Sequence, residues 1–180
     1  MRKIGQILRF LIPVIALAAL VVFMTGAGRR ERATLEKNKA IVMRYADEVW
    51  NKGNMAVADE LEATNFIRYI DTVPEGVIRG READKKFCMG VRTAWPDYHW
   101  VPVDVFAQGD KVAIRGAESA TFTGQLEGWP APNGKKIAYE SVLIFRIAGG
   151  KIVEIRGFYQ DLVMMYGMGL KLVPAEQPGK

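Results

Sequence analysis

The stretch KKIAYESVLIFRIAGGKIVEIRGFY, residues 135–159, decides the fold. Two runs rich in β-branched and aromatic residues, 135–148 and 151–159, flank the pair Gly149-Gly150. Such runs are typical of strands, and a pair of glycines between them is a hairpin signal. The stretch therefore predicts two long antiparallel strands joined by a tight turn.

The residues before this hairpin have the same character. Residues 100–108 and 111–123 are strand-like and meet at Gly109-Asp110, which is a second turn signal. Residues 129–134, WPAPNG, make a longer connection to the hairpin. We therefore expect four long strands in the C-terminal half, followed by a short helix over 162–168.

The strand 135–148 is apolar on both faces. One face carries Ile137, Tyr139, Leu143, Phe145 and Ile147. The opposite face carries Val142 and Ile144. A sheet that is apolar on both sides needs cover on both sides, because large exposed apolar patches are rare on monomers. Helices supply one cover, and we expect a second copy of the chain, in a homodimer, to supply the other.

The N-terminal half of the soluble part reads as helical. Apolar residues at helical spacing predict a helix over 36–50, which ends at the sequence NKGN, and a short one over 55–62. A brief strand over 66–70 and a loop over 71–80 follow. A third helix is predicted over 81–94, with Ala83, Phe87, Val91 and Ala94 on its buried face. Helices first and antiparallel strands afterwards indicate an α+β domain with helices on one side of a sheet.

The first 30 residues form a separate segment. Residues 10–28 carry no charge, and 19 residues in a helix span about 28 Å, close to the thickness of a bilayer core. Two interpretations stay open: a retained membrane anchor, or a signal peptide cleaved after small residues. We expect an inside N-terminus and an exported domain. The expected organisation is a membrane or signal segment over 1–30, a charged linker over 31–37, a domain over 38–170 and a mobile tail over 171–180.

Charge and composition exclude several kinds of function. The 180-residue chain has a net charge of +5, of which Arg2, Lys3 and Arg9 account for three, so the remainder carries +2. We expect no nucleic-acid partner, because the sequence has no dense basic patch with interleaved aromatic residues. Cys88 and His99 are the only residues of their types, so an intrachain disulfide is impossible. No ligand-spaced cluster surrounds either residue, so we expect no metal site and no cofactor.

Seven short motifs occur in the order found in one family. They are NKAIV (38–42), EVWNKGN (48–54), GRE (80–82), AWPD (94–97), GDKVA (109–113), FTG (122–124) and GGKIVE (149–154). In order and spacing they resemble the SnoaL-like polyketide cyclases, over residues 38–170. The resemblance implies the nuclear-transport-factor-2-like fold, which is a curved antiparallel sheet wrapped by N-terminal helices into a cone-shaped barrel with an apolar cavity. In this chain one N-terminal hydrophobic helix precedes it.

The resemblance also implies cofactor-free acid–base chemistry on enolisable carbonyl compounds. This chain departs from the family pattern at the residues that often carry such chemistry. Ile155 and Tyr69 stand where histidines are common, and Gln160 stands where an acid is frequent, with Asp161 one place later. The family's usual acid–base set therefore does not transfer to this sequence.

Three residues remain candidates for catalysis, each with a structural alternative. Asp161 is a candidate base, or the N-cap of the last helix. Glu118 is in phase with interior strand residues and is a candidate base with a raised pKa, or a surface residue paired with Arg146. Tyr69 is a candidate donor to a carbonyl oxygen, or a tyrosine at the edge of the core. Candidate ligand-binding residues are Arg146, Tyr159, Gln160 and Tyr45.

Three functional hypotheses follow. The first is a cofactor-independent cyclase or isomerase that binds an apolar carbonyl compound in the cavity. The second is a non-catalytic, membrane-tethered module that binds an apolar small molecule. The third is a membrane-tethered assembly subunit with a filled cone. The polar atoms that line the cavity distinguish between them.

Overall fold

The computed structural model describes residues 26–73, 75–125 and 129–173. It separates into two compact units, Met1–Lys37 and Asn38–Lys180. In the first unit the described residues, 26–37, are helical. The segment 31–37, expected as a linker, is thus helical, because no proline or glycine interrupts the chain after Gly28.

The expected membrane segment falls almost entirely outside the described residues. Of residues 10–28, only 26–28 are described. Within the described ranges, no helix has the length and apolar character needed to cross a membrane. The anchor therefore stays a prediction.

The second unit begins with helical residues 38–44, which lead into the π-helical η1 (Tyr45–Asn51). Gly53 has φ +71°, the left-handed conformation expected for the NKGN stop, and α2 (Met55–Leu61) follows. The helix α3 (Arg81–Ala94) has the predicted bounds, and α4 (Asp161–Gly167) begins one residue early. The helical predictions are confirmed, except that Ala83 is exposed, because α3 turns Asp84 and Cys88 toward the interior instead.

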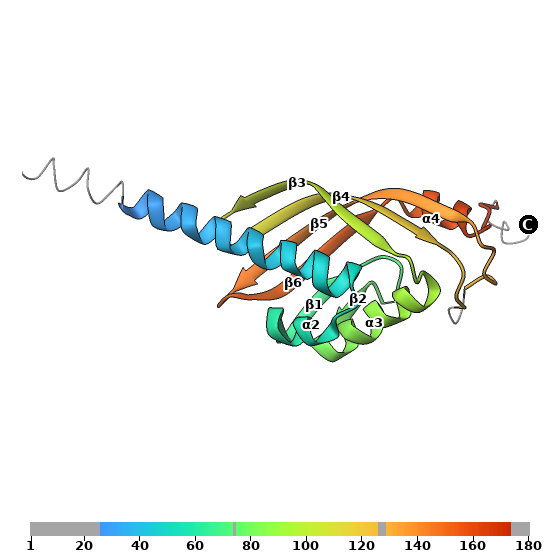
Figure 1. Ribbon diagram of the computed structural model, residues 1–180, viewed down its shortest axis with the longest axis horizontal. Coiled ribbons are helices and arrows are strands. Elements are labelled where there is room, and N and C mark those ends of the chain that lie inside the picture. The colour runs from blue at the N-terminus through green and yellow to red at the C-terminus, as the bar shows by residue number, and fades with distance from the viewer. Residues whose placement is uncertain (1–25, 74, 126–128, 174–180) are drawn as a thin grey trace, which may run out of the picture. The chain divides into compact units, whose positions relative to one another are not determined.

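Six strands form one open sheet in the order β2-β1-β6-β5-β4-β3. Their bounds are β1 (Glu62–Tyr69), β2 (Val77–Arg79), β3 (His99–Gln108), β4 (Lys111–Thr121), β5 (Lys136–Ala148) and β6 (Lys151–Tyr159). The four long C-terminal strands and both hairpin turns are confirmed. In Figure 1 the sheet curves over α2 and α3, which cover one of its faces.

Two features of the predicted sheet are wrong. The sheet is mixed, because β1 pairs with β6 in parallel, and it is not a closed barrel, because β2 and β3 are its unjoined edges.

The segment 71–80, predicted as loop, contains β2, which pairs antiparallel with β1. The strand β1 is also longer than predicted, since its polar residues Glu62 and Arg68 are buried and break the apolar pattern.

Both faces of β5 carry apolar side chains, as predicted. Ile137, Leu143, Phe145 and Ile147 are buried on the inner face. On the outer face Val142 is 41% exposed, directly opposite Phe158 of β6, which is 57% exposed. The homodimer expected to cover this face stays a prediction, because the structure contains one chain.

A buried ion pair joins β1 to α3. Arg68 Nε and Nη2 donate to Asp84 Oδ1 and Oδ2 at 2.5 and 2.8 Å, and both side chains are fully buried. Tyr45 of η1 completes the group: its hydroxyl accepts from Arg68 Nη2 at 2.8 Å and donates to Asp84 Oδ2 at 3.1 Å. Burial raises the pKa of Asp84, but the charge and hydrogen bonds of Arg68 outweigh burial and hold that pKa below its usual value. Asp84 is therefore ionised, and its negative charge balances the positive charge that Arg68 keeps.

Glu62 lies beside this ion pair, is 1% exposed and has a different electrostatic state. Burial and the negative charge of Asp84 raise the pKa of Glu62 to about 9. Its carboxyl is therefore protonated at neutral pH in the folded chain, whereas in the unfolded chain it ionises near pH 4.5. The stabilisation from a protonated Glu62 is complete below pH 4.5 and is lost as the pH rises toward 9.

We predict that Glu62→Gln removes this pH dependence, because glutamine keeps the shape of the acid without its proton equilibrium. The free energy of unfolding of the variant should increase relative to the wild type above pH 5, by up to about 1.4 kcal/mol per pH unit. Urea unfolding at pH 5, 7 and 8.5 measures the difference. Glu60→Gln, at an exposed position two residues away, is the matched control. Parallel pH profiles for Glu62→Gln and the wild type would contradict the assignment.

Candidate functional site

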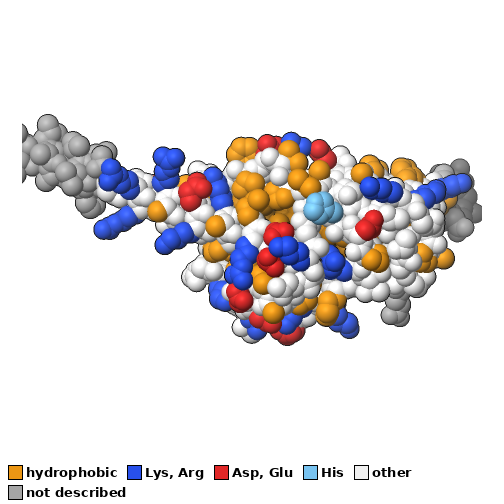
Figure 2. All heavy atoms as spheres, viewed as in Figure 1, with side chains coloured by type: hydrophobic (Ala, Val, Ile, Leu, Met, Phe, Trp, Pro, Cys, Tyr) orange, Lys and Arg blue, Asp and Glu red, His pale blue; other side chains and the backbone are white. Residues whose placement is uncertain are grey.

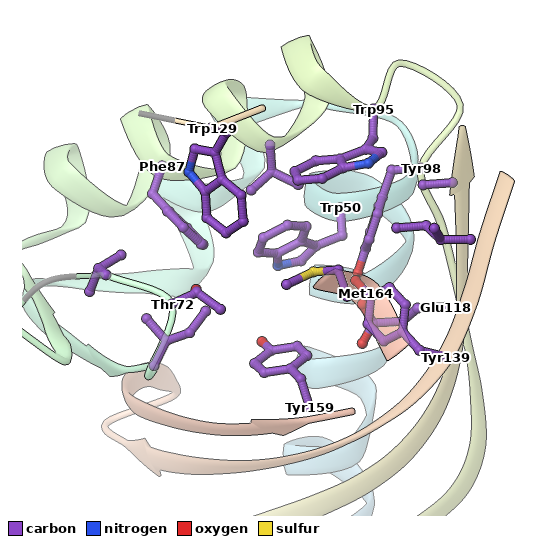
Figure 3. Close-up of a pocket in the computed structure, with 15 residues that line it drawn as sticks. Trp50, Thr72, Phe87, Trp95, Tyr98, Glu118, Trp129, Tyr139, Tyr159 and Met164 are labelled. Atoms are coloured by element: carbon purple, nitrogen blue, oxygen red, sulfur yellow. The ribbon is translucent and has the colours of Figure 1, made fainter. Parts of the chain in front are cut away.

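An apolar cavity of about 270 Å³ lies between the inner face of the sheet and the helices. Seven of the residues that line it are aromatic: Trp50, Phe87, Trp95, Tyr98, Trp129, Tyr139 and Tyr159. Figure 3 shows Trp50, Trp129 and Phe87 directed toward the same space, with Tyr159 opposite them. Helices, strands and loops all contribute lining residues, so the cavity exists only in the folded domain.

Local packing sets the aromatic walls. The Trp50 ring lies 5.5 Å from that of Tyr98 and 6.3 Å from that of Phe87, in tilted and edge-on arrangements that favour aromatic pairs. The position of Tyr159 depends on Gly157, because a Cβ there would lie 2.5 Å from the Tyr159 ring. Any larger residue at 157 would therefore push the ring away from β6.

Glu118 of β4 is the one carboxyl group among the lining residues. It is 3% exposed and lies opposite Tyr139 of β5 in the strand register, so both side chains face the cavity. Tyr98 Oη donates to Glu118 Oε2 at 2.7 Å, while Glu118 Oε1 is buried without a hydrogen-bond partner among the described residues. Figure 3 shows the Tyr98 hydroxyl directed at the Glu118 carboxyl. One oxygen is thus held in place, and the other has no hydrogen-bond partner among the described residues.

The electrostatic environment shifts the pKa of this carboxyl and of the tyrosines around it. Burial raises the pKa of Glu118, and this effect outweighs the opposing one of the Ser141, Tyr98 and Tyr139 hydroxyls. Burial also raises the pKa of Tyr98, Tyr139 and Tyr159 well above the usual value, with Glu118 as a further cause in each. The tyrosine hydroxyls therefore remain protonated donors beside a carboxyl group whose pKa lies above the usual range.

The buried ion pair supports the cavity wall from behind. The Arg68 guanidinium carbon lies 5.3 Å from the centre of the Trp50 ring and 5.7 Å from that of Phe87. Both distances fit cation–π contact. The positive charge of Arg68 also opposes the rise that burial causes in the pKa of Glu118 and of Tyr159. Arg68 thus fixes two lining rings and places a permanent positive charge beneath the site.

Of the residues proposed from the sequence, Glu118 and Tyr159 meet in the cavity. Tyr45 is buried in the Arg68 group instead. Arg146 pairs with Glu154 at 3.6 Å rather than with Glu118, and is 40% exposed. The ring of Tyr69 lies under the Arg156 guanidinium at 3.9 Å. None of these last three residues lines the cavity.

Gln160 and Asp161 lie at the start of α4. Gln160 is the N-cap residue, and its Oε1 accepts the Glu140 backbone N–H at 3.1 Å. Asp161 is the first helical residue, not the N-cap, and its Oδ1 is buried without a partner among the described residues. Burial and the charge of Asp71 raise the pKa of Asp161. Neither side chain lines the cavity, whereas Met164 of the same helix does.

Sequence reasoning missed Tyr98 and Tyr139 as site residues. The sequence pattern does place Tyr139 on the inner face of its strand, since it is in phase with Ile137 and Leu143. Tyr98 stands in a loop, where no periodicity shows its direction. Within the described residues, no group of three or more His, Cys, Asp or Glu side chains is arranged to hold a metal ion.

Comparison with known proteins agrees with this architecture. The model of the family described as SnoaL-like polyketide cyclase matches residues 40–166. A candidate SnoaL-like polyketide cyclase from Jannaschia sp. CCS1 is 24% identical, covers 76% of this chain and 94% of its own, and superposes with a TM-score of 0.69. A comparison with curated proteins gave no match.

Two further solved structures share the fold. IdmH, a candidate polyketide cyclase from Streptomyces antibioticus, is 22% identical, with 74% of this chain and 99% of its own covered and a TM-score of 0.63. A phenazine biosynthesis-related protein from Pseudomonas aeruginosa is 16% identical, with 84% and 97% covered and a TM-score of 0.67. At these identities the likeness establishes the fold alone.

We predict that Tyr98→Phe raises the pKa of Glu118 further, because the lost hydroxyl stabilises the ionised carboxylate. The titration can be followed by NMR of ¹³C-labelled glutamate carboxyls, with the Glu118 signal assigned from Glu118→Gln. Tyr166→Phe, at a half-exposed position on α4, is the matched control. A Glu118 pKa that stays constant or falls in Tyr98→Phe would show that the hydrogen bond has no such effect.

Proposed function

The chain belongs to the SnoaL-like polyketide cyclase family, and from this premise we propose that it binds an apolar carbonyl compound in the aromatic cavity. We propose further that it catalyses a cofactor-free acid–base reaction there, an isomerisation or an intramolecular ring closure. Glu118 is the proton-transferring group. The observation that carries the proposal is a single buried carboxyl with one free oxygen in an otherwise apolar, tyrosine-bearing cavity.

The cavity suits a small, flat, apolar guest. Its volume of about 270 Å³ is close to the lower end of the range of ~300–1,000 Å³ that is usual for ligand sites. Aromatic side chains from several elements form most of its lining, and Met164 adds an adaptable thioether. Polar groups are few and lie close to Glu118, as expected for a site that orients one reactive part of a ligand.

The proposed reaction begins at the free oxygen of the ionised carboxylate. Glu118 Oε1 takes a proton from the carbon next to the ligand carbonyl, and the electron pair of that C–H bond becomes the enolate. The Tyr159 hydroxyl, which has no hydrogen-bond partner among the described residues, donates to the enolate oxygen. Glu118 then returns the proton, either to another carbon in an isomerisation or to the alkoxide that forms when the enolate closes a ring.

A non-catalytic binding role is the alternative. It is supported by the absence of histidine from the lining residues and by the position of Asp161 outside the cavity. The cavity itself argues against the third hypothesis, an assembly subunit with a filled cone. Proton exchange at a ligand carbon distinguishes turnover from binding.

We predict that the full-length protein accelerates exchange of the α-protons of 2-tetralone, an apolar bicyclic ketone, into D2O. The variant Glu118→Gln should lower the enzymatic rate by about 100-fold or more, in line with the usual contribution of a general base. The rate should rise with pH through an inflection above the usual glutamate pKa, because only ionised Glu118 accepts the proton. NMR of the ketone signals gives the rate.

Glu140→Gln is the matched control, because Glu140 is exposed and pairs with Arg115 on the sheet surface. It should exchange 2-tetralone at the wild-type rate. Equal rates for the wild type and Glu118→Gln, with binding of the ketone intact in both, would leave the binding role and remove the catalytic one.

We also propose that residues 10–28 anchor the chain in a membrane with the domain exported. The support is the uncharged run of 19 residues between basic flanks. In cells that express the full chain, we expect the protein to remain with the membrane after alkaline carbonate washing and to be degraded by external protease once the outer barrier is opened. Release by carbonate would indicate cleavage or peripheral binding, and protection from protease would reverse the orientation.

A further inference from the structure

A second hollow adjoins the cavity on its outer side. It is an open groove of about 500 Å³ between α3 and the strand β2. Its lining residues are Val73, Val77, Ile78, Arg79, Ala83, Lys86, Phe87, Gly90 and Val91. Three of them, Val73, Phe87 and Val91, also line the inner cavity. These three apolar side chains therefore form the boundary between the two hollows.

The ionisable residues that line the groove are both positively charged. Arg79 and Lys86 are exposed, they are its two ionisable lining residues, and neither makes a hydrogen bond or ion pair with the described residues. Acidic groups on the same helix are engaged elsewhere. Glu82 pairs with Arg81 and Lys85, and Asp84 is buried against Arg68. Figure 2 shows the resulting mixture of acidic and basic side chains around α2 and α3.

Two unpaired cations over an apolar floor suit an anion that carries an apolar tail. The inner cavity is a poor place for the anionic end, because burial and the Glu118 carboxyl both oppose a second negative charge there. In the groove the anion keeps contact with water and meets two positive charges. The chemistry of the two hollows thus divides a ligand into a neutral part inside and a charged part outside.

We propose that the groove holds the anionic head group, such as a carboxylate, of the ligand whose apolar carbonyl-bearing part occupies the inner cavity. Arg79 and Lys86 bind the head group, and the tail crosses the boundary that Val73, Phe87 and Val91 form between the two hollows. This inference rests on the proposed use of the inner cavity, and it narrows the ligand to an amphiphile with one acidic end. Arg79 and Lys86 are then specificity-determining residues outside the reacting centre.

Isothermal titration of the full-length protein with 6-phenylhexanoate and with its neutral isostere 6-phenylhexanamide tests the proposal. We expect the wild type to bind the carboxylate about tenfold more tightly than the amide, and added salt to reduce that preference. The double variant Arg79→Gln/Lys86→Gln should lose the preference and keep the affinity for the amide. The double variant Lys111→Gln/Lys135→Gln removes the same charge at exposed positions elsewhere and should retain the preference.

The outcomes separate this inference from the proposed function. Equal binding of both compounds by the wild type and by Arg79→Gln/Lys86→Gln overturns the groove as an anion site and leaves the cavity as a binding site. A preference that Lys111→Gln/Lys135→Gln also loses overturns it too, because net charge then explains the effect. If neither compound binds, the groove proposal fails, and exchange of 2-tetralone decides the function of the inner cavity independently.

Discussion

The ion pair between Arg68 and Asp84 is the constraint on which the site depends. Both side chains are fully buried, so removing either partner would leave an unpaired charge in the interior, at a cost of about 3–5 kcal/mol. The pair joins β1 to α3, and Tyr45 adds the start of η1. Because Trp50 and Phe87 stack around the same guanidinium, the walls of the cavity are held where this charge pair holds them.

The charge balance of the interior also separates two buried carboxyls that look alike in the sequence. Glu62 is next to Asp84, so the nearest negative charge adds to burial, raises its pKa to about 9 and keeps it neutral. At Glu118 the hydroxyls of Ser141, Tyr98 and Tyr139 oppose the effect of burial on its pKa, and no neighbouring carboxylate adds to that effect. Glu62 is sealed among protein groups, whereas Glu118 opens on the cavity. Position, rather than pKa alone, is therefore the reason for proposing Glu118 as the functional group.

Local patterns in the sequence predicted what depends on local physics. The hairpins at Gly109 and Gly149 and the bounds of α3 follow from turn chemistry and periodicity over short windows. The phase of Glu118 within a regularly alternating strand indicated an interior position, with a surface position paired with Arg146 left open, and the structure has the interior one. The resemblance to the SnoaL-like polyketide cyclases supplied the fold that these elements share.

Long-range pairing could not be predicted in this way. The parallel contact of β1 with β6 joins residues about ninety positions apart, as in the pair Glu62 and Ile152, and no local signal marks it. Arg68 and Asp84 read as surface residues until the fold buries them together. Asp161, a candidate base or N-cap in the sequence, is the first residue of α4 and does not line the cavity, because the direction of a side chain at a helix start depends on how that helix packs.

The distribution of charge argues for one orientation of a ligand. The positive charge nearest the cavity floor, that of Arg68, is neutralised by Asp84, so it steadies the aromatic walls and biases the pKa of Glu118 without offering a free partner to an anion. The tyrosine hydroxyls stabilise the transient charge of an enolate, which is spread over a carbonyl oxygen and carbon, better than the full charge of a carboxylate. A permanent anion gains more outside, where Arg79 and Lys86 remain hydrated and unpaired among the described residues. Transient charge inside and permanent charge outside is the arrangement with the lowest desolvation cost, and in the proposed complex it brings the reacting carbon, rather than the head group, to Glu118.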